Sequence, residues 1–276
     1  MRRTGWRSLG LLAAIGALTL FVAFPFAWMI STAFKPSNEI FVTPPTLVPS
    51  TVTLANVARL FVETRFATYL GNSVLVASAT VCLTLAIAAP GAYGLTRFRF
   101  RGRETIAGTI LFTYMFAPIM IIIPFYVMMR ALGLANTHTG LVLAYTGLCL
   151  PFALWLLRTF FQSIPLELEE AALTDGATRP QAVRYVILPL ALPGLVATGI
   201  FTFILAWNDY IFARILLAAD ELKTLPIGIA DLYNASVVDW GMIMAAGMLV
   251  LLPVLAIFVF IQKYMVAGWG TGGVKG

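Results

Sequence analysis

The sequence carries very little charge. Of its 276 residues only 11% are Asp, Glu, Lys or Arg, whereas 60% are hydrophobic. Soluble domains carry about 25% charged residues, so this composition excludes an ordinary soluble domain and predicts a membrane protein. The net charge of +6 does not indicate nucleic-acid binding, because the arginines stand beside apolar runs, where such residues report membrane orientation.

Residue types that build metal or catalytic sites are also scarce. The chain has two cysteines and one histidine. Cys82 and Cys149 lie far apart inside apolar runs, and we interpret them as small buried hydrophobic residues. His138 lies in a short polar turn, where a single histidine cannot complete a zinc site with these cysteines. We therefore predict no metal site and no catalytic residue.

The sequence contains neither a nucleotide-binding motif nor much intramembrane charge. No Gly-Lys dipeptide occurs, so a Walker A loop, which would cradle nucleotide phosphates, is absent from the sequence. Asp209 is the single ionisable residue inside the predicted spans. Carriers coupled to protons or sodium usually retain several such groups. A transporter of this composition must therefore take its energy from a partner protein.

Six apolar stretches are long enough to cross a bilayer, which takes about 20 residues. They occupy residues 9–34, 69–96, 106–129, 139–157, 190–212 and 241–262. We predict an all-α polytopic membrane protein with a single transmembrane domain over residues 1–276. The first stretch exceeds the apolar segment of a signal peptide, about 7–15 residues, although a weak cleavage signal at 31–33 leaves that alternative open. Pro118 and Pro124 should bend or interrupt the third span.

The positively charged residues set the orientation. With the N-terminus inside, twelve of the 18 Lys and Arg residues fall on the inner side and the other six on the outer side. Such an excess is typical of the cytoplasmic face, so both termini and residues 163–188 are predicted to be cytoplasmic. Arginines alternate with aromatic residues over 97–103. In a short connector between two spans this pattern favours a cytoplasmic anchor over a nucleic-acid strand.

The polar segment 163–188 has the signals of a helical hairpin. Pro165 suits the first turn of a helix, and the glutamates after it suit the positive end of the helix dipole. Gly176 is a natural C-terminal stop, because glycine adopts the left-handed conformation without strain. Thr178 and Gln181 then have the spacing of a capping box. The segment therefore predicts helix, glycine turn and second helix, which Pro189 interrupts.

One face of the first hairpin helix is suited to a partner protein. Leu168, Ala171, Ala172 and Asp175 lie at positions i, i+3, i+4 and i+7, so they share a face. The two alanines leave a shallow notch, and Glu170 at its border is placed to meet a basic side chain. A well-capped connector without a partner would give the same pattern, so the residues alone leave both interpretations open.

The same segment resembles the EAA loop of ABC importer permeases. The resemblance is carried by Glu170-Ala-Ala, by Gly176 and by Leu188-Pro189, with Val186 in place of the usual isoleucine. Flanking motifs resemble the smaller permease subunit of maltose-type importers: Trp155–Phe161, Ile164–Glu170, Trp207–Asp209, Thr224–Gly228 and Gly273–Gly276. The likeness runs from about Phe34 to the C-terminus.

The resemblance implies a type I ABC importer permease fold, with six transmembrane helices and cytoplasmic termini, in the cell (inner or plasma) membrane. It implies a transport subunit and not an enzyme, for a sugar or sugar-like solute, with no cofactor in this chain and with ATP and Mg²⁺ bound by a partner ATPase dimer. A second related permease subunit, an extracytoplasmic solute-binding protein and membrane lipid are the other implied partners. It assigns coupling to the ATPase to Glu169, Glu170, Ala171, Ala172, Asp175, Gly176, Leu188 and Pro189.

Asn208 and Asp209 are the candidates for the substrate path, where they would meet sugar hydroxyls. The alternative is that Trp207 and Tyr210 form an aromatic belt at the outer interface and that Asp209 is simply hydrated there. A secondary, ion-coupled carrier is the alternative function, and it predicts intramembrane charges and an inverted repeat. A membrane-embedded transferase is disfavoured, because adjacent Glu169 and Glu170 diverge by about 100° on a helix.

Overall fold

The computed structural model describes residues 4–270, and it describes side chains from residue 10 to residue 259. Within that part of the chain all regular structure is helical. The Cα positions divide into two compact units, Met1–Ala67 with Gly228–Val254 and Thr68–Ile227 with Leu255–Gly276. Residues 273–276, which belong to the family resemblance, lie outside the described residues.

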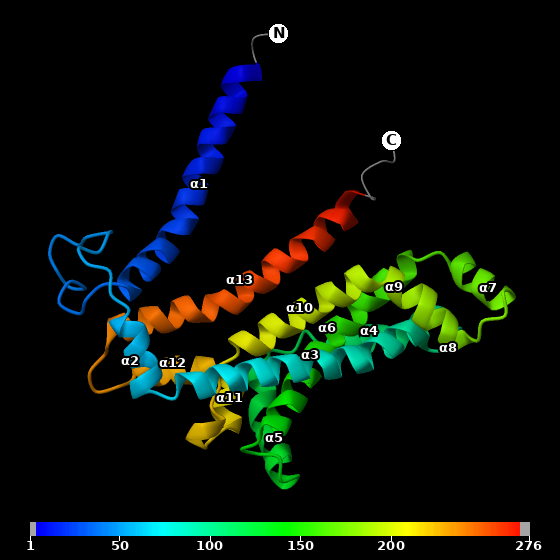
Figure 1. Ribbon diagram of the computed structural model, residues 1–276. Helices are drawn as coiled ribbons and strands as arrows, with labels where there is room; N and C mark the ends of the chain where they lie inside the picture. The colour runs from blue at the N-terminus through cyan, green and yellow to red at the C-terminus, as the bar shows by residue number, and fades with distance from the viewer. Residues whose placement is uncertain (1–3, 271–276) are drawn as a thin grey trace. The chain divides into compact units, whose positions relative to one another are not determined.

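Figure 1 labels the main helices along the chain. Their bounds are α1 Thr4–Ala33, α2 Ala55–Glu63, α3 Phe66–Arg97, α4 Arg103–Thr113, α5 Pro118–Ala131, α6 His138–Ser163, α7 Leu166–Thr174, α8 Arg179–Ala182, the π-helix η1 Val183–Ile187, α9 Leu188–Leu190, α10 Leu192–Asn208, α11 Ile211–Leu216, the 3₁₀ turn η2 Asp220–Leu222, α12 Leu225–Tyr233 and α13 Trp240–Gly270.

Four helices are long and apolar enough to cross a membrane: Gly10–Ala33 within α1, all of α3, all of α6, and Trp240–Val259 within α13. Two bent helix pairs raise this number to six if each pair is one span. The first pair is α4 with α5, and the second is Arg179–Leu190 with α10. The six predicted spans fall on these elements.

The third predicted span is broken. Helices α4 and α5 meet at an angle of 94°, and the chain between them is not helical from Tyr114 to Ala117. Ala117 is extended (φ −61°, ψ 125°), because the ring of a following proline disfavours the helical conformation at the residue before it. Pro118 therefore ends the continuous span, whereas Pro124 lies inside α5.

The fifth predicted span, 190–212, is also interrupted. Helix α10 ends at Asn208, where Asp209 becomes extended (φ −71°, ψ 129°). The Oδ2 atom of Asp209 accepts the backbone N–H groups of Phe212 (3.0 Å) and Ala213 (3.2 Å). A side chain that satisfies the first N–H groups of a helix favours a new start there. Residues 211–216 consequently form the separate helix α11.

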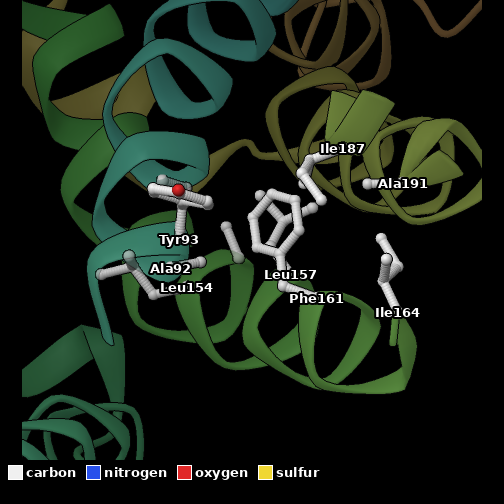
Figure 2. Packing of buried hydrophobic residues seen from close by; sticks show 10 residues of the cluster. Ala92, Tyr93, Leu154, Leu157, Phe161, Ile164, Ile187 and Ala191 are labelled. Atoms are coloured by element: carbon white, nitrogen blue, oxygen red, sulfur yellow. The ribbon is translucent and has the colours of Figure 1, made fainter. Parts of the chain in front are cut away.

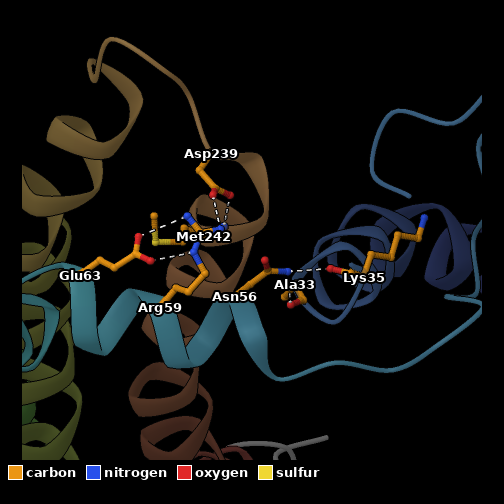
Figure 3. Close-up of polar contacts among 7 residues, drawn as sticks. All are labelled: Ala33, Lys35, Asn56, Arg59, Glu63, Asp239 and Met242. Carbon is orange, nitrogen blue, oxygen red and sulfur yellow. Dashed lines mark hydrogen bonds and ion pairs between the residues drawn. The ribbon is translucent and has the colours of Figure 1, made fainter. Parts of the chain in front are cut away.

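In the first unit, α2 ties the end of α1 to the start of α13 (Figure 3). Asn56 is buried, and its Nδ2 donates to the backbone oxygens of Ala33 (3.0 Å) and Lys35 (2.8 Å). One turn further along α2, Arg59 pairs through Nη1 with Asp239 Oδ2 at 2.7 Å. Asn56 thereby fixes the start of the loop between α1 and α2 against α2, and Arg59 joins α2 to the residue before α13.

In the second unit, a cluster of buried hydrophobic residues lies where α3, α6 and η1 meet (Figure 2). Ala92 and Tyr93 of α3 face Leu157 and Phe161 of α6, and Ile187 of η1 closes the cluster. The rings of Tyr93 and Phe161 are edge to face, with centroids 6.2 Å apart, a favourable geometry for aromatic pairs. The hairpin packs against this apolar cluster.

Candidate functional site

The first arm of the hairpin begins where the sequence predicts a helix. The sequence predicts Pro165 in the first turn, and the structure places it at the N-cap (φ −56°, ψ 136°), immediately before Leu166, the first helical residue of α7. Glu167 and Glu169 fall in the first turn of α7, where negative charge is favourable.

The turn after α7 has the hydrogen bonds of a Schellman motif. Gly176 is left-handed (φ +88°), and its N–H donates to the Leu173 oxygen at 3.1 Å. The N–H of Ala177 reaches the Ala172 oxygen at 3.0 Å. These two bonds satisfy carbonyl groups that the end of a helix leaves without partners. The predicted left-handed stop at Gly176 is present in the structure.

Gly176→Val is expected to uncouple transport while the protein still reaches the membrane. A β-branched residue at this φ costs about 1–3 kcal/mol, so the turn would reshape and change the angle between α7 and α8. The measurement is solute-stimulated ATPase activity of the assembled importer, normalised to membrane-inserted protein. Ala177→Val is the matched control, because the adjacent residue does not have a positive φ. Wild-type stimulation in Gly176→Val would contradict the assigned turn geometry.

The second arm combines a cap with a π-helix. The backbone N–H of Thr178 donates to Gln181 Oε1 at 2.7 Å, as the capping-box spacing predicts. After α8 the chain widens into η1, where the Leu188 N–H bonds to the Val183 oxygen, five residues back. Such a π-turn accommodates Pro189, which has no N–H to donate. The segment Arg179–Leu190 and α10 meet at an angle of 72°. The bend lies at Ala191, two residues before Pro193, whereas the sequence predicts an interruption at Pro189.

The predicted partner face of α7 is exposed. Leu168 has 43% of its surface accessible, and Glu170, Ala171 and Asp175 are also exposed. Ala172 is half-buried. An acidic group beside a small residue and an accessible leucine is a surface that a basic, closely fitting partner would cover. We call these four exposed residues, Leu168, Glu170, Ala171 and Asp175, the α7 outer face.

Glu169 lies on the opposite side of α7 and is buried. Its Oε2 is 3.0 Å from Arg97 Nε, and both side chains are at most 8% exposed. Tyr93 Oη donates to Glu169 Oε1 at 2.5 Å, and Arg97 Nη2 donates to the Ile164 oxygen at 3.0 Å. We call Tyr93, Arg97 and Glu169 the α3–α7 latch. It joins the hairpin to the end of a long apolar helix, so Glu169 is placed to position α7 and not to touch a partner.

A second attachment lies on the other arm. The guanidinium of Arg179 is 5.2 Å from the centroid of the Phe98 ring, within the range of a cation–π contact. Phe98 itself packs edge to face on Tyr93, with centroids 5.9 Å apart. Both arms of the hairpin are therefore anchored on the last turn of α3 and the residue that follows it.

The two substrate-path candidates lie at the far end of α10. Asn208 is exposed, and its Nδ2 donates to the Ile204 oxygen at 2.9 Å. Asp209 is half-buried and, besides capping α11, accepts a hydrogen bond of 2.9 Å from the buried hydroxyl of Tyr145 on α6. Asn208 thus presents an accessible side chain, whereas Oδ2 of Asp209 is engaged in joining three helices.

The chain matches the family model described as the inner membrane component of binding-protein-dependent transport systems, over residues 83–269. It is 34% identical over 270 residues to the inner membrane ABC transporter permease protein YcjP of Escherichia coli (strain K12), covering 97% of this chain and 96% of that protein. It is 37% identical over 277 residues to the trehalose transport system permease protein SugB of Mycobacterium tuberculosis (strain CDC 1551 / Oshkosh), covering 100% and 98%. This chain belongs to that family of permeases.

A solved structure supports the same assignment. A chain from a bacterial ABC transporter involved in the import of the acidic polysaccharide alginate superposes with a TM-score of 0.83, at 27% identity, over 96% of this chain and 99% of that chain. The predicted all-α, ABC importer permease fold is thereby confirmed. The findings support a transport subunit of the membrane and give no support to the ion-coupled carrier.

In this permease the predicted site residues form two groups. The hairpin residues lie near one end of α10, with Leu188 half-buried and Pro189 exposed on α9, whereas Asn208 lies at the other end. Since α10 has 17 residues, it is about 25 Å long. Sequence reasoning missed Tyr93, Arg97 and Tyr145. The four-residue spacing of Tyr93 and Arg97 indicates that they share a helix face. Nothing in the sequence indicates that their partner is Glu169, which lies 72 or more positions away.

Proposed function

We propose that this permease imports a sugar or sugar-like solute and is driven by a separate ATPase that docks on the α7 outer face. The observation that carries the proposal is that α7 is latched to α3 on one side and exposes an acidic, small-residue surface on the other. Relatives at similar identity are permeases for trehalose and, at 36% over 264 residues, for diacetylchitobiose in Streptomyces coelicolor. ATP and Mg²⁺ belong to the partner, since this chain has no Walker A loop.

The latch supplies a route for the mechanical coupling. A push on α7 reaches Arg97 and Tyr93 through a buried ion pair and a hydrogen bond. Tyr93 packs on Phe161 of α6, so the displacement reaches two apolar helices together. Closely packed interiors transmit such displacements because they have few voids to absorb them. The arginine and lysine distribution supports a cytoplasmic position for this hairpin and for both termini.

The assembly is expected to be heteromeric. This chain presents one hairpin, whereas an ATPase dimer offers two sockets, and a second related permease fills the other socket. Purification of the tagged chain at native levels should therefore recover a second permease together with the ATPase. A stable homodimer that carries ATPase and lacks any second permease would refute this arrangement.

Transport by the purified complex tests the function itself. Proteoliposomes that contain the complex should accumulate labelled sugar only under two conditions. ATP must be present on the side of the membrane that carries the ATPase, and an extracytoplasmic solute-binding protein must be present on the opposite side. The solute is identified first, as the sugar that raises the melting temperature of that binding protein in a thermal-shift panel. Uptake that persists without ATP and follows an imposed proton or sodium gradient would overturn the proposal.

A further inference from the structure

The connector 97–103, which joins α3 to α4, contains arginines of two kinds. Arg97 is buried in the α3–α7 latch. Arg103 donates to Glu104 Oε1 at 3.1 Å and to the Thr96 oxygen at 3.4 Å. Arg99 and Arg101 are exposed, and within the described residues neither side chain makes a hydrogen bond, ion pair or ring contact. The connector therefore uses two arginines to hold the fold and presents two without a partner.

The backbone places the two exposed arginines beside one hollow. The N–H of Arg103 bonds to the Phe100 oxygen at 3.4 Å, and Gly102 is left-handed (φ +87°), so the connector turns sharply before α4. A turn of this kind requires a residue that tolerates positive φ at its third position. Beside this turn lies an open pocket of about 530 Å³, which is lined by the continuous segment from Arg99 to Thr105.

The charge of this pocket is positive. Glu104 is its single acidic residue, and Arg158 meets both oxygens of that carboxylate at 2.7 Å while Arg103 is 2.9 Å away. Glu104 is thus matched within the protein, which leaves the charges of Arg99 and Arg101 uncompensated. Guanidinium groups bind phosphate in forked geometry with charge-assisted hydrogen bonds. The pocket accordingly favours a singly or doubly charged phosphate.

The surroundings of the pocket favour a lipid as the carrier of such a phosphate. Phe98 and Phe100 alternate with the arginines and are 44% and 45% exposed, and the connector joins two predicted spans. Aromatic side chains beside arginines at the end of a span are typical of the membrane interface, and basic clusters immediately after a span bind anionic headgroups.

We propose that Arg99 and Arg101 form a site for the phosphate of an anionic phospholipid headgroup, such as phosphatidylglycerol, next to the α3–α7 latch. The inference rests on the membrane arrangement in the proposed function. Because Arg97 and Phe98 of the same connector hold the two arms of the hairpin, a bound headgroup stabilises the segment on which the hairpin is anchored. The site thereby ties the coupling hairpin to the lipid surface.

The test measures lipid retention on the whole purified importer. Detergent-solubilised complex is delipidated and titrated with phosphatidylglycerol or phosphatidylcholine, and bound lipid is counted by native mass spectrometry. Wild type should bind phosphatidylglycerol in preference to phosphatidylcholine. In Arg99→Ala/Arg101→Ala the ratio of the two affinities should fall on the order of tenfold or more, since each interfacial arginine contributes about a fivefold factor. Arg99→Lys/Arg101→Lys keeps the charge but loses the forked donors, so it should bind more phosphatidylglycerol than the double alanine variant and less than wild type.

Two outcomes would overturn the proposal. One is equal phosphatidylglycerol binding by wild type and by Arg99→Ala/Arg101→Ala. The other is displacement of the lipid by glycerol phosphate at equal concentration, which would assign the pocket to a soluble anion. Arg130→Ala, which removes an exposed arginine at the end of α5, is the matched control and should bind lipid as wild type does. Lipid retention is measured without sugar uptake, so its failure leaves the proposed function standing, and failure of uptake leaves the lipid result intact.

Discussion

Replacing Glu169 with alanine is expected to abolish most solute uptake and to lower the yield of folded permease. The change removes the partner of Arg97, whose side chain is only 8% exposed, and the acceptor of the Tyr93 hydroxyl. Breaking one half of a buried ion pair typically costs about 3–5 kcal/mol, because a charge stays buried without compensation. A loss of that size exceeds most single contacts in the hairpin, so α7 should detach from α3.

The measurements are solute uptake by proteoliposomes that contain the complex, the yield of folded permease, and the thermal stability of the purified complex. Glu167→Ala is the matched control for stability, since Glu167 is an exposed carboxylate on the first turn of the same helix and its loss should leave the thermal stability near wild type. Arg97→Ala/Glu169→Ala removes both charges and should be less unstable than the sum of the two single variants. If Glu169→Ala is as stable and as active as wild type, the latch does not position the hairpin.

Glu170→Lys is expected to reach the membrane in normal amounts and to lose its ATPase on purification. Glu170 is exposed beside Ala171, which also lies on the α7 outer face. Reversing its charge opposes the basic side chain proposed on the ATPase, and like-charge contacts at interfaces cost several kcal/mol. Even a loss of about 1.4 kcal/mol weakens a complex tenfold. Co-purification of the ATPase and solute-stimulated hydrolysis are the two measurements.

The control for Glu170→Lys separates reversal of the charge from its loss at the same position. Glu170→Gln does so, because it keeps the length of the side chain and removes the charge without adding a cation, so it should retain more ATPase than Glu170→Lys. Arg179→Glu is unsuitable as a control, since Arg179 stacks on Phe98 and its loss would disturb the second arm. Normal co-purification and normal transport by Glu170→Lys would show that this residue does not dock the ATPase.

The features that depend only on neighbouring residues could be predicted from the sequence. The apolar stretches predict the long helices because about 20 apolar residues are needed to span a bilayer, whatever the partners of those helices are. The stop at Gly176 and the cap between Thr178 and Gln181 follow from backbone conformation and hydrogen bonds over a few positions. The family motif likewise lies in one contiguous segment, so it needed no knowledge of the fold.

Which residues of that segment face the rest of the chain depends on tertiary contacts and could not be predicted from the segment itself. Glu169 and Glu170 are adjacent and chemically identical, yet one is buried against Arg97 and the other is exposed. The difference depends on how α7 packs on α3, which brings together residues 72 positions apart. The same reason explains Asp209, whose partner Tyr145 lies on α6. Local sequence specifies a helix and its ends, but the direction in which a helix is buried is set by contacts that only the folded chain creates.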